Sequence, residues 1–177
     1  IGDWDMIMRG ESWRVFNHIQ ENDRNKFDDS LKTYRQLAEK HQMQIHIWVT
    51  TSAMALTAIS DGGFDKAEQA AEEALRLGEL MRLKSALGVY GTQMFTIRRE
   101  QGRLAEVAPV FKQFVDDNPG EAAWRPGLAL IACDLGFLEP ARKTFDEIAE
   151  EGFYLPYDAK RSATLSYLSE VCSCLGD

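Results

Sequence analysis

The chain has 177 residues, of which 45% are hydrophobic and 27% are charged, and these totals fit one soluble globular domain. Its net charge of -8 argues against nucleic acid or an anionic membrane surface as a partner, because phosphate binding needs a basic face. No apolar run approaches the roughly 18 residues of a membrane span, and no signal segment opens the chain, so we expect a cytoplasmic protein.

Helical periodicity dominates the first part of the chain, and no stretch alternates as a β-strand would. Met6–Ile19 is a candidate helix, and Lys26–His41 is a weaker amphipathic one. Ile45–Ile59 is rich in Ala, Met, Leu and Trp, and the amphipathic segment that starts at Phe64 follows it. Lys84–Arg99 is the next predicted helix. A long apolar helix therefore alternates with an amphipathic one.

The second part continues this alternation through four further predicted helices. They are Leu104–Val115, Trp124–Leu135, Leu138–Ile148 and Arg161–Leu175. Pro109 falls inside the first of them, where we expect a kink or a lost hydrogen bond near Ala105, because proline has no N–H to donate. Pro140 is expected in the first turn of its helix, where a missing N–H is harmless.

Glycines in the predicted turns recur at a nearly regular interval. Gly62, Gly102, Gly136 and Gly176 are 40, 34 and 40 residues apart. A period of this size is typical of helical arrays, in which helix pairs stack because one pair cannot bury its apolar face alone. We therefore expect Gly102 to end one helix in a backbone conformation that a side chain would hinder.

The segments at these glycines resemble the tetratricopeptide repeat, which places Gly and a large residue at the turn, then Ala, then an aromatic residue. They read "GGFDKAEQAA", "GRLAEVAPVFKQFVDDNP" and "GFLEPARKTF". The resemblance covers 45–177, with 1–41 as a degenerate first repeat. It implies one all-α domain over 1–177, with about eight helices in antiparallel pairs stacked as a right-handed superhelical solenoid. The 40-residue intervals depart from the 34-residue unit of that family.

A narrower resemblance concerns Met94 to Ala149, through the words "RREQGRL", "WRPGLAL" and "ARKTFDEIA". This segment is similar to C-terminal helical repeat regions of large bacterial signalling ATPases, which join an ATPase core to an adenylate cyclase or helix-turn-helix output domain. The resemblance implies a sensor or scaffold region. Because the chain opens with Ile1 and ends just after the turn glycine Gly176, we expect a fragment of a longer protein.

Motifs for catalysis or for a cofactor are missing from the sequence. There is no phosphate-binding G-x-x-x-x-G-K-[ST] loop. His41 and His46 would point about 140° apart on a helix and could not share a metal. Three cysteines are too few for a disulfide framework, so Cys133, Cys172 and Cys174 are expected to be reduced thiols. We therefore expect no enzyme, no cofactor and no metal site.

Binding candidates come from the first helix of each predicted pair, which would line the concave surface of a stacked array. Aromatic and Arg side chains there can anchor a peptide or an anionic group. The candidates are Trp48, Tyr90, Arg98, Arg99, Trp124 and Arg125. The alternative for both Trp residues is packing between repeats. The alternative for Arg98 and Arg99 is pairing with Glu100, Glu106 or the helix C-terminus.

These patterns favour a non-catalytic protein-interaction or effector-sensing module of a larger bacterial signalling or transcription regulator. Its partners would be a protein segment, other domains of the parent protein or a small effector, without nucleic acid or membrane. The alternative is an oligomerisation or autoinhibitory scaffold without its own ligand, in which exposed apolar surface favours a homo-oligomer. A helical enzyme with an unrecognised site is the third hypothesis.

Overall fold

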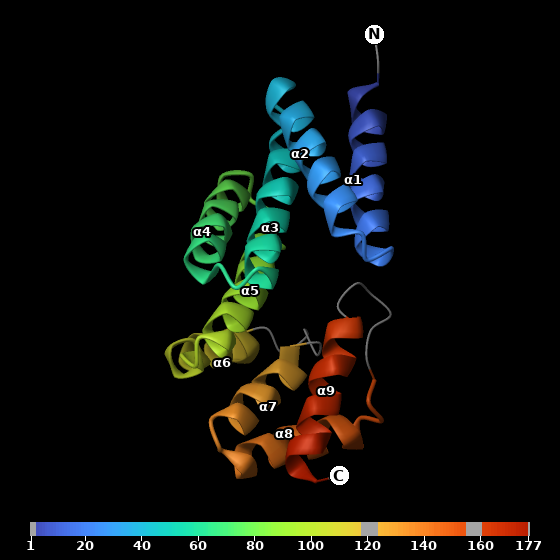
Figure 1. Ribbon diagram of the computed structural model, residues 1–177. Coiled ribbons are helices and arrows are strands. Elements are labelled where there is room, and N and C mark those ends of the chain that lie inside the picture. Colours follow the sequence, from blue (N-terminus) through green and yellow to red (C-terminus); the bar gives the residue numbers. More distant parts are fainter. Residues whose placement is uncertain (1–2, 118–123, 155–160, 177) are drawn as a thin grey trace. The chain divides into compact units, whose positions relative to one another are not determined.

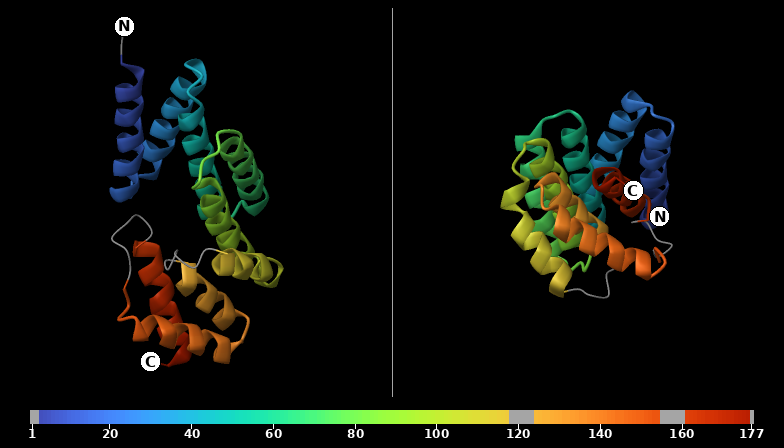
Figure 2. Two further views of the ribbon diagram at one scale, coloured as in Figure 1. Left: turned by 180° about the vertical axis from the view of Figure 1, so that it is seen from behind. Right: turned by 90° about the horizontal axis from the view of Figure 1, so that it is seen from below.

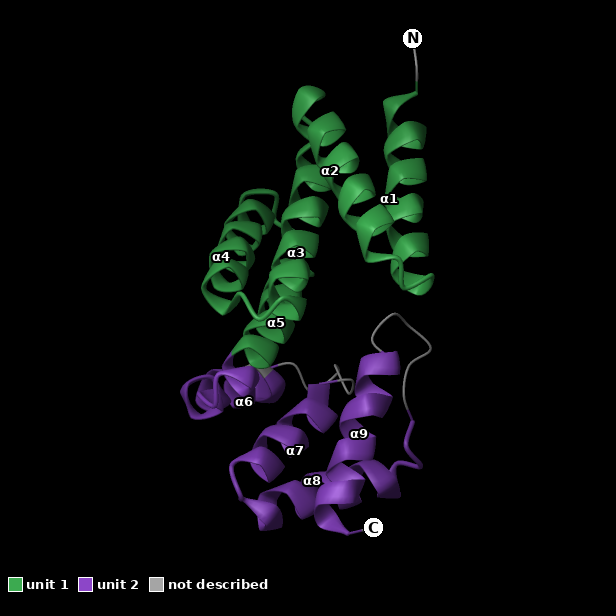
Figure 3. Cartoon of the chain, in the orientation of Figure 1, with its two compact units in different colours: residues 1–97 green, residues 98–177 purple. Residues whose placement is uncertain are grey.

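The computed structural model describes residues 3–117, 124–154 and 161–176. These ranges form nine α-helices and one 3-10 helix, and they contain no strand. The all-α prediction is confirmed, with one α-helix more than the eight or so expected. None of the described helices combines the length and the apolar character needed to cross a bilayer. The chain divides into two compact units, 1–97 and 98–177 (Figure 3).

Unit 1 contains five helices, and the first four have the same length. They are α1 (Trp4–Gln20), α2 (Arg24–Lys40), α3 (Gln44–Ser60), α4 (Phe64–Leu80) and α5 (Ala86–Glu100), the last of which ends in unit 2. Each of the first four helices spans 17 residues, and their first residues are 20 positions apart along the chain. α2 packs against both α1 and α3, and α3 packs against α4 (Figures 1 and 2).

The first five helices end in the same tight turn, which explains the regular spacing. An N–H after the turn bonds to a carbonyl five residues earlier, at 2.7–3.1 Å, and the residue before that N–H has a positive φ. This is the Schellman motif. The positive-φ residues are Asn22, Gln42, Gly62, Arg82 and Gly102. Successive turns of this kind are therefore 20 residues apart. The predicted interval of 40 residues between Gly62 and Gly102 arose because the turn between them has Arg82, not glycine, at the positive-φ position.

Exchanging residues at these turns should change stability through backbone conformation alone. Gly102→Ala should lower the free energy of unfolding by about 1 kcal/mol, because a left-handed backbone is strained for L-residues. An added Cβ at Gly102 would meet nothing within 4 Å, so no clash contributes. Gln42→Gly, where φ is 51°, should raise stability by roughly 0.5 kcal/mol. Urea unfolding followed by circular dichroism measures both, and equal stability of Gly102→Ala and the parent protein would contradict this account.

Unit 1 buries two apolar clusters. The cluster between α1, α2 and α3 is formed by Met8, Val15, Phe27, Leu31, Tyr34 and Ala38. The cluster between α3, α4 and α5 is formed by Ala55, Ala67, Ala71, Met94 and Ile97. The second cluster is built mainly from alanines, so the backbones of its helices approach closely.

Unit 2 contains the remaining helices. They are the 3-10 helix η1 (Leu104–Glu106), α6 (Ala108–Asp117), α7 (Arg125–Asp134), α8 (Leu138–Glu150) and α9 (Arg161–Leu175). α7 is the central helix and packs against α6, α8 and α9. Figure 2 shows α7 and α9 side by side from a second direction. Gly127 of α7 allows this packing, because a Cβ there would lie 3.1 Å from Phe111 and 3.8 Å from Tyr167.

The expected kink at Pro109 is wrong. The segment predicted as one helix is divided into η1 and α6, and α6 begins at Ala108. Pro109 is therefore in the first turn of α6, where its missing N–H leaves no hydrogen bond unmade. The first α-helical bond of the segment is donated by the Phe111 N–H to the Val107 carbonyl at 2.9 Å.

Candidate functional site

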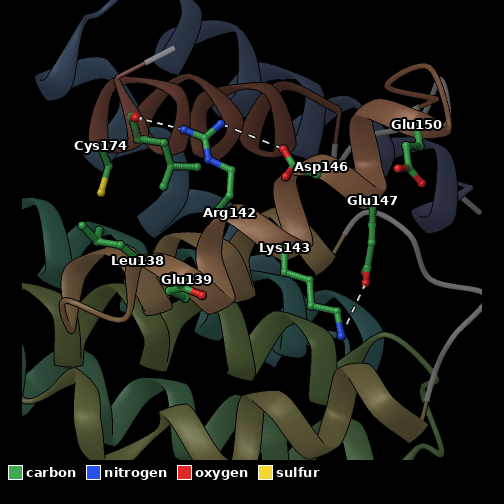
Figure 4. Close-up of a pocket in the computed structure, with 9 residues that line it drawn as sticks. Leu138, Glu139, Arg142, Lys143, Asp146, Glu147, Glu150 and Cys174 are labelled. Carbon is green, nitrogen blue, oxygen red and sulfur yellow. Dashed lines mark hydrogen bonds and ion pairs between the residues drawn. The ribbon is translucent and has the colours of Figure 1, made fainter.

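A groove of about 600 Å³ runs along one face of α8 in unit 2 (Figure 4). Seven of its lining residues come from α8, and Cys174 and Leu175 come from the end of α9. Ala141, Phe145 and Ile148 form the buried face of α8, so the charged residues between them face outward. The local sequence "LEPARKTFDEIAE" thus builds a helix that is anchored on one face and open on the other.

The groove carries more negative than positive charge. Its carboxylates are those of Glu139, Asp146, Glu147 and Glu150, and its cations are Arg142 and Lys143. Arg142 donates a hydrogen bond to the Leu175 carbonyl at 3.0 Å and lies 3.9 Å from Asp146. Lys143 lies 4.0 Å from Glu147.

Two carboxylates at opposite ends of the groove are not neutralised. Within the described residues, Glu139 and Glu150 form no ion pair. They are 11 residues apart, which places them on the same side of a helix and about 16 Å apart along its axis. Leu138, which is 51% exposed, and Leu175 add apolar surface at one end. The groove can therefore attract cations at two points and bury an apolar side chain.

The two binding candidates in unit 1 contribute to helix packing. Trp48 is half-buried, and its indole Nε1 lies 3.0 Å from the position that a Cβ on Gly78 would occupy. Tyr90 packs against the alanine-rich cluster of α3, α4 and α5. Neither residue lines the α8 groove, and the packing role is the alternative raised for Trp48.

Arg98 and Arg99 are neighbours in sequence but have different partners. Arg98 is buried, donates to Gln101 at 2.9 Å and lies 3.6 Å from Glu106, the acid proposed for it. Arg99 donates to Asp134 of α7 and to Glu170 of α9, both at 2.6 Å. Hydrogen bonding to Glu170 is the main cause that raises the Arg99 pKa. Neither partner of Arg99 was expected from the sequence, because both are distant from it in the chain.

Trp124 and Arg125 stand at the start of α7. The Trp124 ring meets Phe111 edge-on, with 6.0 Å between the ring centroids. Arg125 donates hydrogen bonds from both terminal nitrogens to Glu151, one of them at 2.9 Å. This pairing raises the Arg125 pKa and lowers the Glu151 pKa. None of the six candidates lines the groove, and a binding role for them stays a prediction.

A second polar cluster is buried in unit 1. The Tyr34 hydroxyl and His46 Nδ1 are hydrogen-bonded at 2.6 Å, and Ser12 also bonds to Tyr34. Burial lowers the pKa of His46 and raises that of Tyr34. The residues that the structure describes contain no group of three or more side chains arranged to hold a metal ion. Because both rings are buried and the pKa of His46 is lowered, we expect this cluster to contribute to stability and to its pH dependence.

Comparisons with protein-family models, with curated proteins and with solved structures find no match to this chain. The tetratricopeptide and signalling-ATPase resemblances therefore stay predictions. The charged face of α8 was not predicted, because the helix was recognised from its apolar positions alone. Its signal was the repetition of charged residues at i and i+4 between those positions.

Proposed function

We propose that this chain is a non-catalytic protein-interaction module of a larger bacterial signalling or transcription regulator. The observation that carries this proposal is the α8 groove, in which two carboxylates that pair with none of the described residues flank a mixed-charge helix face. The Schellman turns and the packing of α7 on both α8 and α9 support an array of antiparallel helix pairs stacked as a right-handed solenoid. A cytoplasmic location is part of the same proposal.

The occupant proposed for the groove is a basic amphipathic helical segment of a partner protein. Its two cations would be about 16 Å apart, or 11 residues on a helix, to meet Glu139 and Glu150. An apolar residue of the segment would cover Leu138 and Leu175. Helices that lie in grooves are commonly recognised through such an apolar face, with charges that fix register and orientation.

Charge reversal tests this proposal. A fluorescein-labelled helical peptide of Ala, Leu and Lys, with two Lys eleven positions apart, should bind and raise fluorescence anisotropy. The double variant Glu139→Lys, Glu150→Lys should bind this peptide about tenfold more weakly, because exposed ion pairs contribute roughly 0.2–1 kcal/mol each and reversal adds repulsion. A peptide with Glu in place of Lys should not bind.

The matched control is Glu72→Lys, Glu79→Lys, which makes the same change of net charge on exposed positions of α4. This control should bind the Lys peptide like the parent protein. Equal weakening by both double variants would show that only net charge matters, and it would overturn the groove as the site. Tight binding of the Glu peptide would overturn the proposed chemistry of the partner.

The scaffold hypothesis is the second candidate, and one observation favours it. Met6, Trp13 and Phe16 of α1 are 64%, 66% and 49% exposed. The Trp13 and Phe16 rings meet edge-on, with 5.8 Å between their centroids. Under this hypothesis the occupant is a second copy of the chain, because homodimer interfaces are richer in apolar surface than other interfaces. Light scattering separates the two functions: a stable dimer without peptide supports the scaffold, and a monomer that binds the peptide supports the module.

A further inference from the structure

Two cysteines from different helices of unit 2 meet beside the groove. Cys133 is buried on α7, Cys174 is exposed on α9, and the two side chains lie close enough for Cys174 to help raise the pKa of the buried Cys133 thiol. The chain carries a third cysteine, Cys172, which is partly buried. A helix places residues two apart about 160° from one another, so Cys172 and Cys174 point to different sides of α9.

The packing of α7 against α9 also brings the segments that carry these thiols side by side. The Arg99 guanidinium bonds at 2.6 Å to both Asp134 and Glu170, so these two positions flank one group. Cys133 immediately precedes Asp134, and Cys174 follows Glu170 by one helical turn on the same face. The helices also meet further along their length, where Gly127 faces Tyr167.

We propose that Cys133 and Cys174 form a redox pair that a peroxide converts to a disulfide joining α7 to α9. Hydrogen peroxide reaches the exposed Cys174 first, and the thiolate attacks one peroxide oxygen to give a sulfenic acid and hydroxide. The Cys133 sulfur then attacks the sulfenic sulfur, the S–S bond forms, and the released hydroxide takes the Cys133 proton to leave as water. In total two thiols and one peroxide give one disulfide and two waters.

The different environments of the two cysteines explain why Cys174 is oxidised first and Cys133 reacts second. Burial raises the pKa of the Cys133 thiol to about 12, with a further contribution from the nearby Cys174 side chain. The reactive form of cysteine is the thiolate, so Cys133 is protected from direct oxidation while both groups are reduced. Oxidation of Cys174 gives an electrophilic sulfenic sulfur, which the neighbouring Cys133 sulfur can then attack.

The disulfide would also act on the groove, because Cys174 and Leu175 line one end of it. A covalent link to α7 restricts the end of α9 and withdraws the Cys174 sulfur from the groove. This consequence rests on the proposed binding function. Formation of the disulfide does not, because thiol counts and masses are measured without any peptide.

The experiment treats the full chain with hydrogen peroxide and counts thiols after denaturation. The three thiols of the reduced protein should fall to one, with a loss of two hydrogens in the intact mass and full recovery in dithiothreitol. Peptide mapping without reductant should connect the peptides that carry Cys133 and Cys174. The rate should not depend on protein concentration, because the reaction is intramolecular.

Single variants make the assignment specific. Cys172→Ser should form the disulfide at the parent rate, whereas Cys133→Ser should accumulate oxidised Cys174 that a sulfenic-acid reagent traps. A link through Cys172, a link between two chains, or thiol loss in Cys133→Ser indistinguishable from that in the parent protein would each overturn the proposal. Circular dichroism of every variant confirms that the helical fold is retained.

Discussion

Gly78→Ala should destabilise unit 1 by about 1–3 kcal/mol, although alanine is the better helix former. Gly78 is buried near the end of α4, where a Cβ would lie 2.4 Å from the Ala86 Cβ and 3.0 Å from Trp48 Nε1. Contact at 2.4 Å cannot be tolerated, so the start of α5 must move away from α4. Urea unfolding followed by circular dichroism measures the loss.

Two further variants show whether the close approach is the cause. Gly10 of α1 has open space around an added Cβ, so Gly10→Ala should instead stabilise the protein by roughly 0.5–1 kcal/mol. The double variant Gly78→Ala, Ala86→Gly should recover part of the loss, because it removes the clashing methyl group. The close-packing account fails if Gly78→Ala stabilises the protein as Gly10→Ala does.

Tyr34→Phe should lower the free energy of unfolding by about 1–3 kcal/mol, because it leaves buried polar groups without a partner. The Tyr34 side chain is 1% exposed and His46 is 9% exposed, so water cannot replace the lost hydroxyl. The control is Tyr154→Phe, since Tyr154 is 75% exposed and its hydroxyl is reached by solvent. Urea unfolding of both variants should show a loss only for Tyr34→Phe.

His46 should also make the stability depend on pH. Its pKa in the folded state is lowered from 6.5, mainly by burial, while Asp5 acts to raise it and Arg9 to lower it. Between the folded and unfolded pKa values the unfolded chain binds more protons, so stability rises with pH in that window. The stability is therefore full above about pH 6.5 and declines as the pH falls through the lowered folded value.

The variant His46→Asn isolates this dependence, because asparagine can bond to Tyr34 but does not titrate. The free energy of unfolding of the parent protein, taken relative to that of His46→Asn, should decrease as the pH is lowered from 7.5 to 5. The parent protein should lose more stability than the variant as the pH falls. Parallel pH profiles for the two proteins would rule out His46 as the titrating group.

Much of the secondary structure was accessible from local sequence pattern. The helical period at Phe64, Ala67 and Ala71 predicted α4, and the turn at Gly102 was placed correctly because glycine favours a positive φ. The same turn was missed at Gln42 and Arg82, because these residues adopt a positive φ only where the surrounding hydrogen bonds impose it. The division of the helix at Pro109 was missed because a preceding 3-10 turn has no distinct pattern.

The sequence by itself determined the all-helical class, the approximate helix ranges and the glycine turns, because these depend on interactions within a few residues. Only the tertiary structure decided which α8 carboxylates have no ion-pair partner in the described part of the chain, which partners Arg99 takes, and that Cys133 lies near Cys174. It also separated Gly78, which contacts another helix, from Gly10, which does not. These facts depend on which helices pack together and in what register, and a local pattern carries no information about either.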